Sequence, residues 1–243
     1  QDQLYMDQAL RLAERGRGQT SPNPMVGAVV VSDREQIVGT GYHSRAGESH
    51  AEVVALNEFV LQARDGTLYC TLEPCNHQGR TGPCAGRVVD AGIRRVVLGM
   101  VDPNPLVSGN GIAFLRGHGL DVQVGLRQAA VERLTETFRV WVTRGRPFVT
   151  MKVAISQDGK VAARPGEQTL LTSEDSQREV HKTRAEVDAI GVGSTTLLVD
   201  NPQLTVRGVQ RSRPFTRVVF DRRLRMRLTS KLVHTLEEGP IIV

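Results

Sequence analysis

The sequence predicts an α/β protein in which helices cover the faces of a sheet. Two observations indicate this class. Segments with a helical spacing of apolar residues alternate with short apolar runs. Gly, Pro, Asn or Asp residues between them predict turns and loops. The 243 residues are 40% hydrophobic and 23% charged, which excludes a disordered chain. At about 150 residues a domain, this length predicts one large domain or two compact ones.

Each element of the first 145 residues has its own signal. The apolar spacing of residues 3–15 predicts a helix that Gly16 and Gly18 end. Two apolar runs joined by the polar residues 32–35 predict a pair of strands at 26–31 and 37–42. The same criteria predict, in chain order, helix 50–61, strand 67–72, helix 84–91, strand 94–100, helix 112–117, strand 120–124 and helix 129–142.

A second domain is predicted after Gly145-Arg146-Pro147, so the expected domains are 1–145 and 146–243. Thr172-Ser173 is expected to cap a helix at 174–185. Apolar runs predict strands at 148–156, 187–192 and 216–221. The last residues, 240–243, start another apolar run, and we therefore expect this domain to be incomplete.

Composition narrows the classes of function. No apolar run approaches the roughly 18–20 residues that span a bilayer, and no leader pattern opens the chain, so no membrane association is expected. Three cysteines cannot form a disulfide framework, and the odd count predicts a reducing, cytoplasmic location. The net charge of +5 suits nucleic acid, a phosphorylated metabolite or NADP, but aromatic residues at 4% are few for base stacking.

The residues that carry chemistry are gathered between positions 50 and 84. His50-Ala51-Glu52 opens a predicted helix, and Cys75 and Cys84 follow the next predicted strand. One His and two Cys are ligands that suit zinc, and three protein ligands leave a position for water, as in catalytic sites. Glu52 is expected to move a proton from that water to a leaving amine. A zinc-bound water and such a proton carrier together predict hydrolytic deamination. Cys70, inside an apolar strand, is expected to be a core residue.

Two other classes of function remain open at this point. A closed structural zinc site, with His77 as a fourth ligand, would suit a non-enzymatic nucleic-acid-binding module. A deaminase that acts on a nucleoside or a tRNA base would use the same three ligands. The polar loop 76–83 separates the two cysteines by nine positions and places Arg80 where it would suit a phosphate.

Several motifs resemble the bifunctional riboflavin-biosynthesis deaminase-reductase family. They cover most of the chain: Ser21-Pro22-Asn23-Pro24, Gly41-Tyr42-His43, His50-Ala51-Glu52-Val53, residues 71–84, Asp102-Pro103-Asn104-Pro105, Lys152 with 156–160, and 200–207. The resemblance implies a cytidine-deaminase-like three-layer α/β/α domain followed by part of a dihydrofolate-reductase-like α/β domain. It implies no nucleic-acid partner.

For the first domain, the resemblance implies zinc-dependent deamination of a phosphorylated diaminopyrimidine. Zinc would be bound by His50, Cys75 and Cys84, and Glu52 would be the catalytic residue. The positions that resemble the family's pyrimidine and phosphate contacts are Asn23, His43, His77 and Arg80. We also expect a homo-oligomer.

For the second domain, the resemblance implies NADPH-dependent reduction of the ribosyl chain to a ribityl chain. Cofactor-binding positions fall on Ala154, Leu170, Thr196 and Asp200, and substrate-binding positions fall on Gln168, Arg184, Leu204 and Arg207. The sequence departs from the family pattern at Val54, Gln168 and Leu170. Because the family continues beyond the last strand seen here, we expect this chain's reductase activity to be weak or absent.

Overall fold

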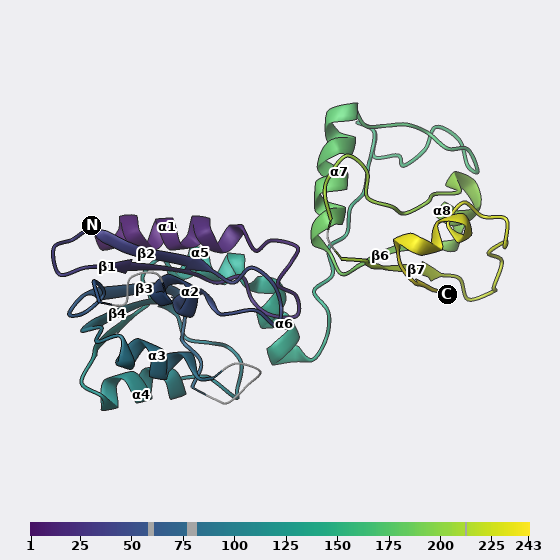
Figure 1. Ribbon diagram of the computed structural model, residues 1–243. Helices are drawn as coiled ribbons and strands as arrows, with labels where there is room; N and C mark the ends of the chain where they lie inside the picture. Colours follow the sequence, from purple (N-terminus) through teal and green to yellow (C-terminus); the bar gives the residue numbers. More distant parts are fainter. Residues whose placement is uncertain (58–60, 77–81, 212) are drawn as a thin grey trace. The chain divides into compact units, whose positions relative to one another are not determined.

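The computed structural model describes residues 1–57, 61–76, 82–211 and 213–243. The chain divides into two compact units, Gln1–Val149 (unit 1) and Thr150–Val243 (unit 2), which are coloured purple to teal and teal to yellow in Figure 1. Helices and strands alternate along both units, so the predicted α/β class is confirmed. Within the described ranges, no helix combines the length and the apolar character needed to cross a bilayer.

Unit 1 is built on a five-stranded sheet with the strand order β2-β1-β3-β4-β5. Its central strand β3 pairs antiparallel with β1 and parallel with β4. β1 pairs antiparallel with β2, and β4 pairs parallel with β5. The five strands are β1 (Gly27–Val31), β2 (Ile37–Tyr42), β3 (Thr67–Leu72), β4 (Arg95–Met100) and β5 (Asp121–Val124).

Helices cover both faces of this sheet and make it the middle of three layers (Figure 1). One face carries α1 (Asp2–Glu14) and α5 (Gln128–Leu134), and the other carries α2 (Ala51–Asn57), α3 (Cys84–Asp90) and α4 (Asn110–Gly117). Every residue of β1 is buried because both of its faces are covered. α6 (Glu136–Arg144) follows α5.

The helix α2 rests directly on the backbone of β2. A Cβ on Gly39 would lie 2.0 Å from the carbonyl oxygen of Ala55, and a Cβ on Gly41 would lie 2.3 Å from that of Ala51. Both distances are far shorter than van der Waals contact, so only glycine permits this approach. The two glycines therefore set the height at which α2 sits on the sheet.

Unit 2 has a smaller, parallel sheet with the order β6-β7-β8. Its elements are α7 (Glu174–Glu186), β6 (Ala189–Gly193), α8 (Ser194–Asp200), β7 (Thr216–Phe220), a 3-10 helix at Val233–Glu238 and β8 (Ile241–Ile242). The Ser173 side chain accepts a hydrogen bond from the Ser176 backbone N–H, as expected for the cap of α7. A small cluster forms the core: Leu197, Leu204, Val219 and Leu232.

A buried arginine also holds unit 2 together. The Arg217 side chain is 0% exposed. Its guanidinium donates to the carbonyl oxygens of Leu232 at 3.1 Å and Gly239 at 2.5 Å and to Thr235 Oγ1 at 2.7 Å. These bonds tie β7 to the segment around the 3-10 helix, where buried carbonyl groups need donors.

Two predicted elements differ in kind from the observed ones, and the bounds of a third are only partly described. Residues 148–156 form no strand, because within the described ranges no neighbouring strand pairs with them. The helix predicted at 129–142 is two helices that meet at Thr135, whose hydroxyl donates to the Val131 carbonyl at 2.8 Å. The helix predicted at 50–61 begins at Ala51 and is described to Asn57, and residues 58–60 lie outside the described ranges.

Candidate metal centre and active site

The mixed sheet brings distant segments to one edge. β1 runs antiparallel to β2 and β3, so the start of β1 lies beside the ends of β2, β3 and β4. This edge receives Asn23 before β1, His43 after β2 and Cys75 after β3. His50, immediately before α2, and Cys84, the first residue of α3, lie at the same edge. Topology therefore gathers side chains from 62 positions of sequence, 23 to 84, into one place.

Three metal-binding atoms converge here. His50 Nδ1 lies 3.1 Å from Cys84 Sγ and 3.6 Å from Cys75 Sγ. All three donor atoms lie within 4.8 Å of one another. Tetrahedral zinc bonds of roughly 2.0–2.3 Å hold such donors about 3.5–3.8 Å apart. The 3.6 Å separation lies in this range and the 3.1 Å separation is slightly shorter, so small side-chain movements would let one imidazole and two thiolates hold a zinc ion with its fourth position open.

The electrostatics of this cluster favour metal ligands. The hydrogen bond from Cys84 lowers the pKa of Cys75 to about 4, so one sulfur is readily a thiolate. The neighbouring Cys75 sulfur also raises the pKa of His50. Both cysteine side chains are buried, which limits their exposure to oxidants.

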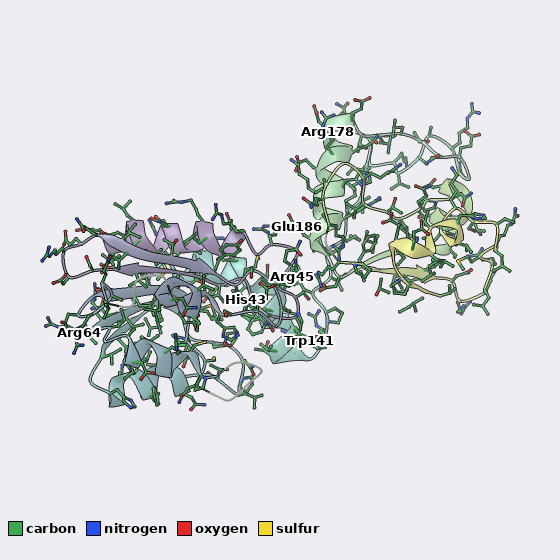
Figure 2. All side chains as sticks on the ribbon, viewed as in Figure 1. His43, Arg45, Arg64, Trp141, Arg178 and Glu186 are labelled. Atoms are coloured by element: carbon green, nitrogen blue, oxygen red, sulfur yellow. The ribbon has the colours of Figure 1, made fainter. Side chains whose placement is uncertain are left out.

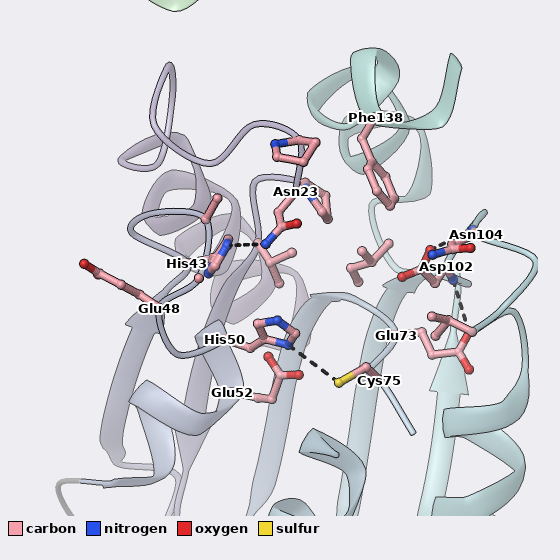
Figure 3. A pocket seen from close by; sticks show the side chains of 17 residues that line it. Asn23, His43, Glu48, His50, Glu52, Glu73, Cys75, Asp102, Asn104 and Phe138 are labelled. Atoms are coloured by element: carbon pink, nitrogen blue, oxygen red, sulfur yellow. Dashed lines mark hydrogen bonds between the residues drawn. The ribbon is translucent and has the colours of Figure 1, made fainter. Parts of the chain in front are cut away.

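The cluster opens into a cavity of about 410 Å³. Glu52 lines it from the first turn of α2, beside His50, and is 3% exposed (Figure 3). Burial is the main cause that raises the pKa of Glu52. A carboxyl group held in such an environment can both accept and return a proton.

On the opposite side of His50, a hydrogen-bonded pair fixes an amide. His43 Nδ1 donates to the carbonyl oxygen of Ser49 at 3.2 Å, so Nε2 accepts from Asn23 Nδ2 at 3.0 Å. Burial lowers the pKa of His43, which favours this neutral imidazole. The Asn23 amide is thereby oriented with its oxygen away from His43 (Figure 3).

The remaining walls combine apolar and polar side chains. Phe138 points into the cavity from α6, while Trp141 on the same helix is 51% exposed (Figures 2 and 3). Asp102 and Asn104 reach the cavity from the loop after β4, and Asp102 Oδ1 accepts from the Asn104 backbone N–H at 2.8 Å. The sequence motif predicted a turn at these two residues but not their place at the site.

A second buried carboxylate, Glu73, was not predicted from the sequence. It follows β3, lines the cavity and is 4% exposed. Both of its oxygens accept hydrogen bonds from backbone amides. The sequence did contain a signal for this residue, because Glu73 stands between the buried Leu72 and the Pro74-Cys75 pair. A carboxylate buried at such a position requires hydrogen-bond donors.

Two of the expected pyrimidine and phosphate contacts, His77 and Arg80, lie outside the described residues. Cys70 is fully buried in the core beside β1, as its apolar strand predicted.

The positions expected to bind NADPH lie in two parts of unit 2. Ala154 and Leu170 belong to the segment before α7, and Leu170 is 79% exposed. Thr196 and Asp200 lie on α8. These four positions are therefore divided between an irregular segment and a helix.

The positions expected to bind the second domain's substrate are partly brought together. Arg184 Nη1 donates to the Thr205 carbonyl at 3.2 Å, and the Arg207 backbone N–H donates to His181 Nδ1 at 3.1 Å. Burial, and next the nearby Arg207, lower the pKa of Arg184. The Leu204 side chain is buried in the core and Gln168 is exposed.

Two family models match the chain. One, described as the cytidine and deoxycytidylate deaminase zinc-binding region, matches residues 1–100. The other, described as the RibD C-terminal domain, matches residues 147–243. The first match contains the whole metal cluster.

Known proteins match most or all of the chain. The riboflavin biosynthesis protein RibD of Aquifex aeolicus is 45% identical over 242 residues, which are 100% of this chain and 67% of the relative. RibD of Escherichia coli is 48% identical over 85% of this chain and 56% of its own length. A solved Thermotoga maritima structure, named a diaminohydroxyphosphoribosylaminopyrimidine deaminase/5-amino-6-(5-phosphoribosylamino)uracil reductase, is 39% identical with a TM-score of 0.91. That likeness covers 100% of this chain and 69% of the solved chain. This chain thus spans about two thirds or less of these proteins.

Proposed function

The chain belongs to the RibD family of riboflavin-biosynthesis proteins, and from this premise we propose that residues 1–145 form a zinc-dependent pyrimidine deaminase. The substrate is a diaminopyrimidine that carries a phosphoribosylamino group, the compound after which the Thermotoga maritima deaminase is named. The observation that carries the proposal is the His50–Cys75–Cys84 cluster beside Glu52 in one cavity. A structural zinc site or a nucleic-acid-binding module is not favoured by membership of this enzyme family.

Each residue then has a role in the reaction. His50, Cys75 and Cys84 hold the zinc ion, which when bound supplies a Lewis acid that makes water nucleophilic near neutral pH. Glu52 takes a proton from the attacking water and returns it to the exocyclic amino nitrogen. The C–O bond forms, the C–N bond breaks, and ammonia leaves.

The other cavity residues orient the pyrimidine. The oxygen of Asn23, held in place by the His43 contact, accepts a hydrogen bond from a ring or amino N–H. Phe138 and the apolar wall supply a face for the ring. His77 and Arg80 remain candidates for the phosphate.

Glu52→Gln in the full, zinc-loaded chain tests this proposal. Loss of the proton carrier is expected to slow ammonia release from the diaminopyrimidine by about 10²–10⁴-fold. Ammonia is measured by a coupled assay and zinc content by elemental analysis. The matched control is Glu14→Gln, at an exposed position at the end of α1. This substitution should change neither ammonia release nor zinc content. Unchanged turnover in Glu52→Gln, with zinc retained, would contradict the assignment.

We propose that unit 2 forms part of the reductase that the family match indicates. Ala154, Leu170, Thr196 and Asp200 are proposed for NADPH, and Gln168, Arg184, Leu204 and Arg207 are proposed for the ribosyl substrate. Homo-oligomerisation and a cytoplasmic location stay predictions.

A further inference from the structure

Glu73 makes an unusual set of contacts for a carboxylate. Its Oε1 accepts from the backbone N–H groups of Gly111 at 2.9 Å and Ile112 at 3.1 Å. Its Oε2 accepts from those of Asp102 at 3.1 Å and Gly109 at 2.9 Å. Four backbone donors therefore surround one buried side chain, and both oxygens are already occupied.

Three of these donors belong to the start of α4. Gly109 is the N-cap of this helix, and Gly111 and Ile112 are in its first turn; the cap residue has no side chain of its own to accept from them. The amides at a helix start lack partners within the helix and carry the positive end of the helix dipole. The Glu73 carboxylate, which comes from β3, supplies the missing acceptors and the matching charge.

The fourth donor joins a second loop to the same carboxylate. Asp102 follows β4, and its side chain lines the cavity. The backbone N–H of Glu73 also donates to the Met100 carbonyl at 3.1 Å. Glu73 therefore connects the ends of β3 and β4 to the first turn of α4.

The metal ligand Cys75 lies two residues after Glu73, in a segment held from both sides. A Cβ on Gly111 would lie 2.0 Å from the Pro74 carbonyl oxygen, so α4 packs against this carbonyl. The Cys75 carbonyl accepts from the Ala85 backbone N–H at 3.1 Å, which ties it to α3 and the neighbouring ligand Cys84. The position of the Cys75 sulfur is set by these backbone contacts.

We propose that Glu73 is a positioning residue that holds Cys75 in place for zinc. Both of its oxygens accept from backbone amides, so its role is to hold the loop, and proton transfer stays with Glu52. The proposal rests on the zinc site of the proposed function but not on the identity of its substrate.

Glu73→Gln tests the proposal because it keeps the shape and exchanges an acceptor oxygen for an NH₂ group. That group would face two backbone N–H donors, so the loop must move. Zinc affinity, measured by competition with a chromophoric chelator, is expected to fall about 10–100-fold, as for other groups that orient metal ligands. The visible absorption bands of the cobalt(II)-loaded protein are expected to shift, because they report the arrangement of the ligands.

Glu132→Gln on α5 is the matched control and should change neither readout, because its carboxylate accepts from Gln128 on the same helix and from none of the zinc ligands among the described residues. If Glu73→Gln lowers thermal stability but leaves zinc affinity and the cobalt spectrum unchanged, the positioning role is wrong. If Glu73→Gln does not fold, Glu73→Asp replaces it. The aspartate keeps the charge but is one methylene too short for all four amides, and unchanged affinity would again overturn the proposal. Failure of the unsubstituted chain to bind zinc would overturn the proposed function and this inference together.

Discussion

Unit 1 and unit 2 are both α/β, but they obtain internal order in different ways. The sheet of unit 1 is covered on both faces, and its core contains long rows of buried aliphatic residues. Unit 2 has a four-residue buried cluster and relies on Arg217, a buried charge, to tie its segments together. Several apolar side chains of unit 2 are largely exposed, among them Met151, Ile155, Leu170 and Phe220.

This difference matters for chemistry, because a site needs neighbours that do not move. In unit 1, every proposed ligand follows a strand end or opens a helix whose position is fixed by packing. In unit 2, the proposed cofactor positions Ala154 and Leu170 lie in a segment without helices or strands. The comparison predicts a preorganised site in unit 1 and a less constrained one in unit 2.

Zinc removal is expected to have the largest effect and tests the difference between unit 1 and unit 2 directly. A ligand that binds only the folded state stabilises it by about 4 kcal/mol at a thousand times its dissociation constant. Chelation is therefore expected to accelerate hydrogen exchange in peptides from β1–β4 and to leave peptides from β6–β8 unchanged. Mass-spectrometric exchange measures both units in one sample. Equal loss of protection in the two units would show that their stabilities are not separate.

The next effect concerns the buried cation of unit 2. Arg217→Met keeps much of the side-chain bulk but removes the guanidinium donor of the Gly239 carbonyl, while the Leu232 carbonyl keeps the Thr235 hydroxyl as a donor. A buried unsatisfied group costs about 1–3 kcal/mol, so a loss of about 1–3 kcal/mol is expected. Exchange in β7 and β8 measures this loss.

Arg223→Met removes the same charge from an exposed position and serves as the control. Similar exchange rates in Arg217→Met and Arg223→Met would mean that unit 2 does not depend on the buried guanidinium.

The smallest expected effect on stability concerns Asp2, at the start of α1 in unit 1. Hydrogen bonds from Arg95 and Tyr69 lower the pKa of Asp2 to about 2, and the Coulomb attraction of Arg95 adds to them. Because the pKa is lowered in the folded state, this contribution to stability is present above the unfolded pKa of about 3.9 and is lost as the pH falls through about 2.

Asp2→Asn should therefore reduce the free energy of unfolding at pH 7 by only about 0.5–1 kcal/mol, because the side chain is partly exposed and solvent screens the pair. Urea denaturation between pH 7 and pH 2 measures it. The difference between variant and parent should shrink as the pH falls from 4 to 2; a constant difference would mean that Asp2 stays protonated or unpaired.

Much of unit 1 could be predicted from the sequence because its signals are local. The strands at 37–42 and 67–72 match the observed bounds, and His50, Cys75 and Cys84 converge as their residue types suggested. Apolar runs identify buried strands, and ligand types identify the metal. These signals need no knowledge of distant partners.

The sequence-based predictions failed where contacts with distant parts of the chain determine the structure. Residues 148–156 have the composition of a strand, but pairing, which sequence alone does not show, makes a strand. Thr135 divides a helix that looks continuous in apolar spacing. Phe138 is far from the zinc motif in sequence, and only the fold brings it to the cavity. Glu73 lies two residues before Cys75, but its role depends on backbone amides of distant segments.

The contact of α2 with Gly39 and Gly41 has a consequence for how this protein tolerates change. Glu52 is carried by α2, and the height of α2 on the sheet is set by backbone meeting backbone. Exchanges among the aliphatic side chains beneath α2 can therefore alter stability while the reach of Glu52 toward the metal ligands is preserved. A single methyl group added at either glycine would instead lift the whole helix and separate the proton carrier from its partners, however stable the rest of the fold remained.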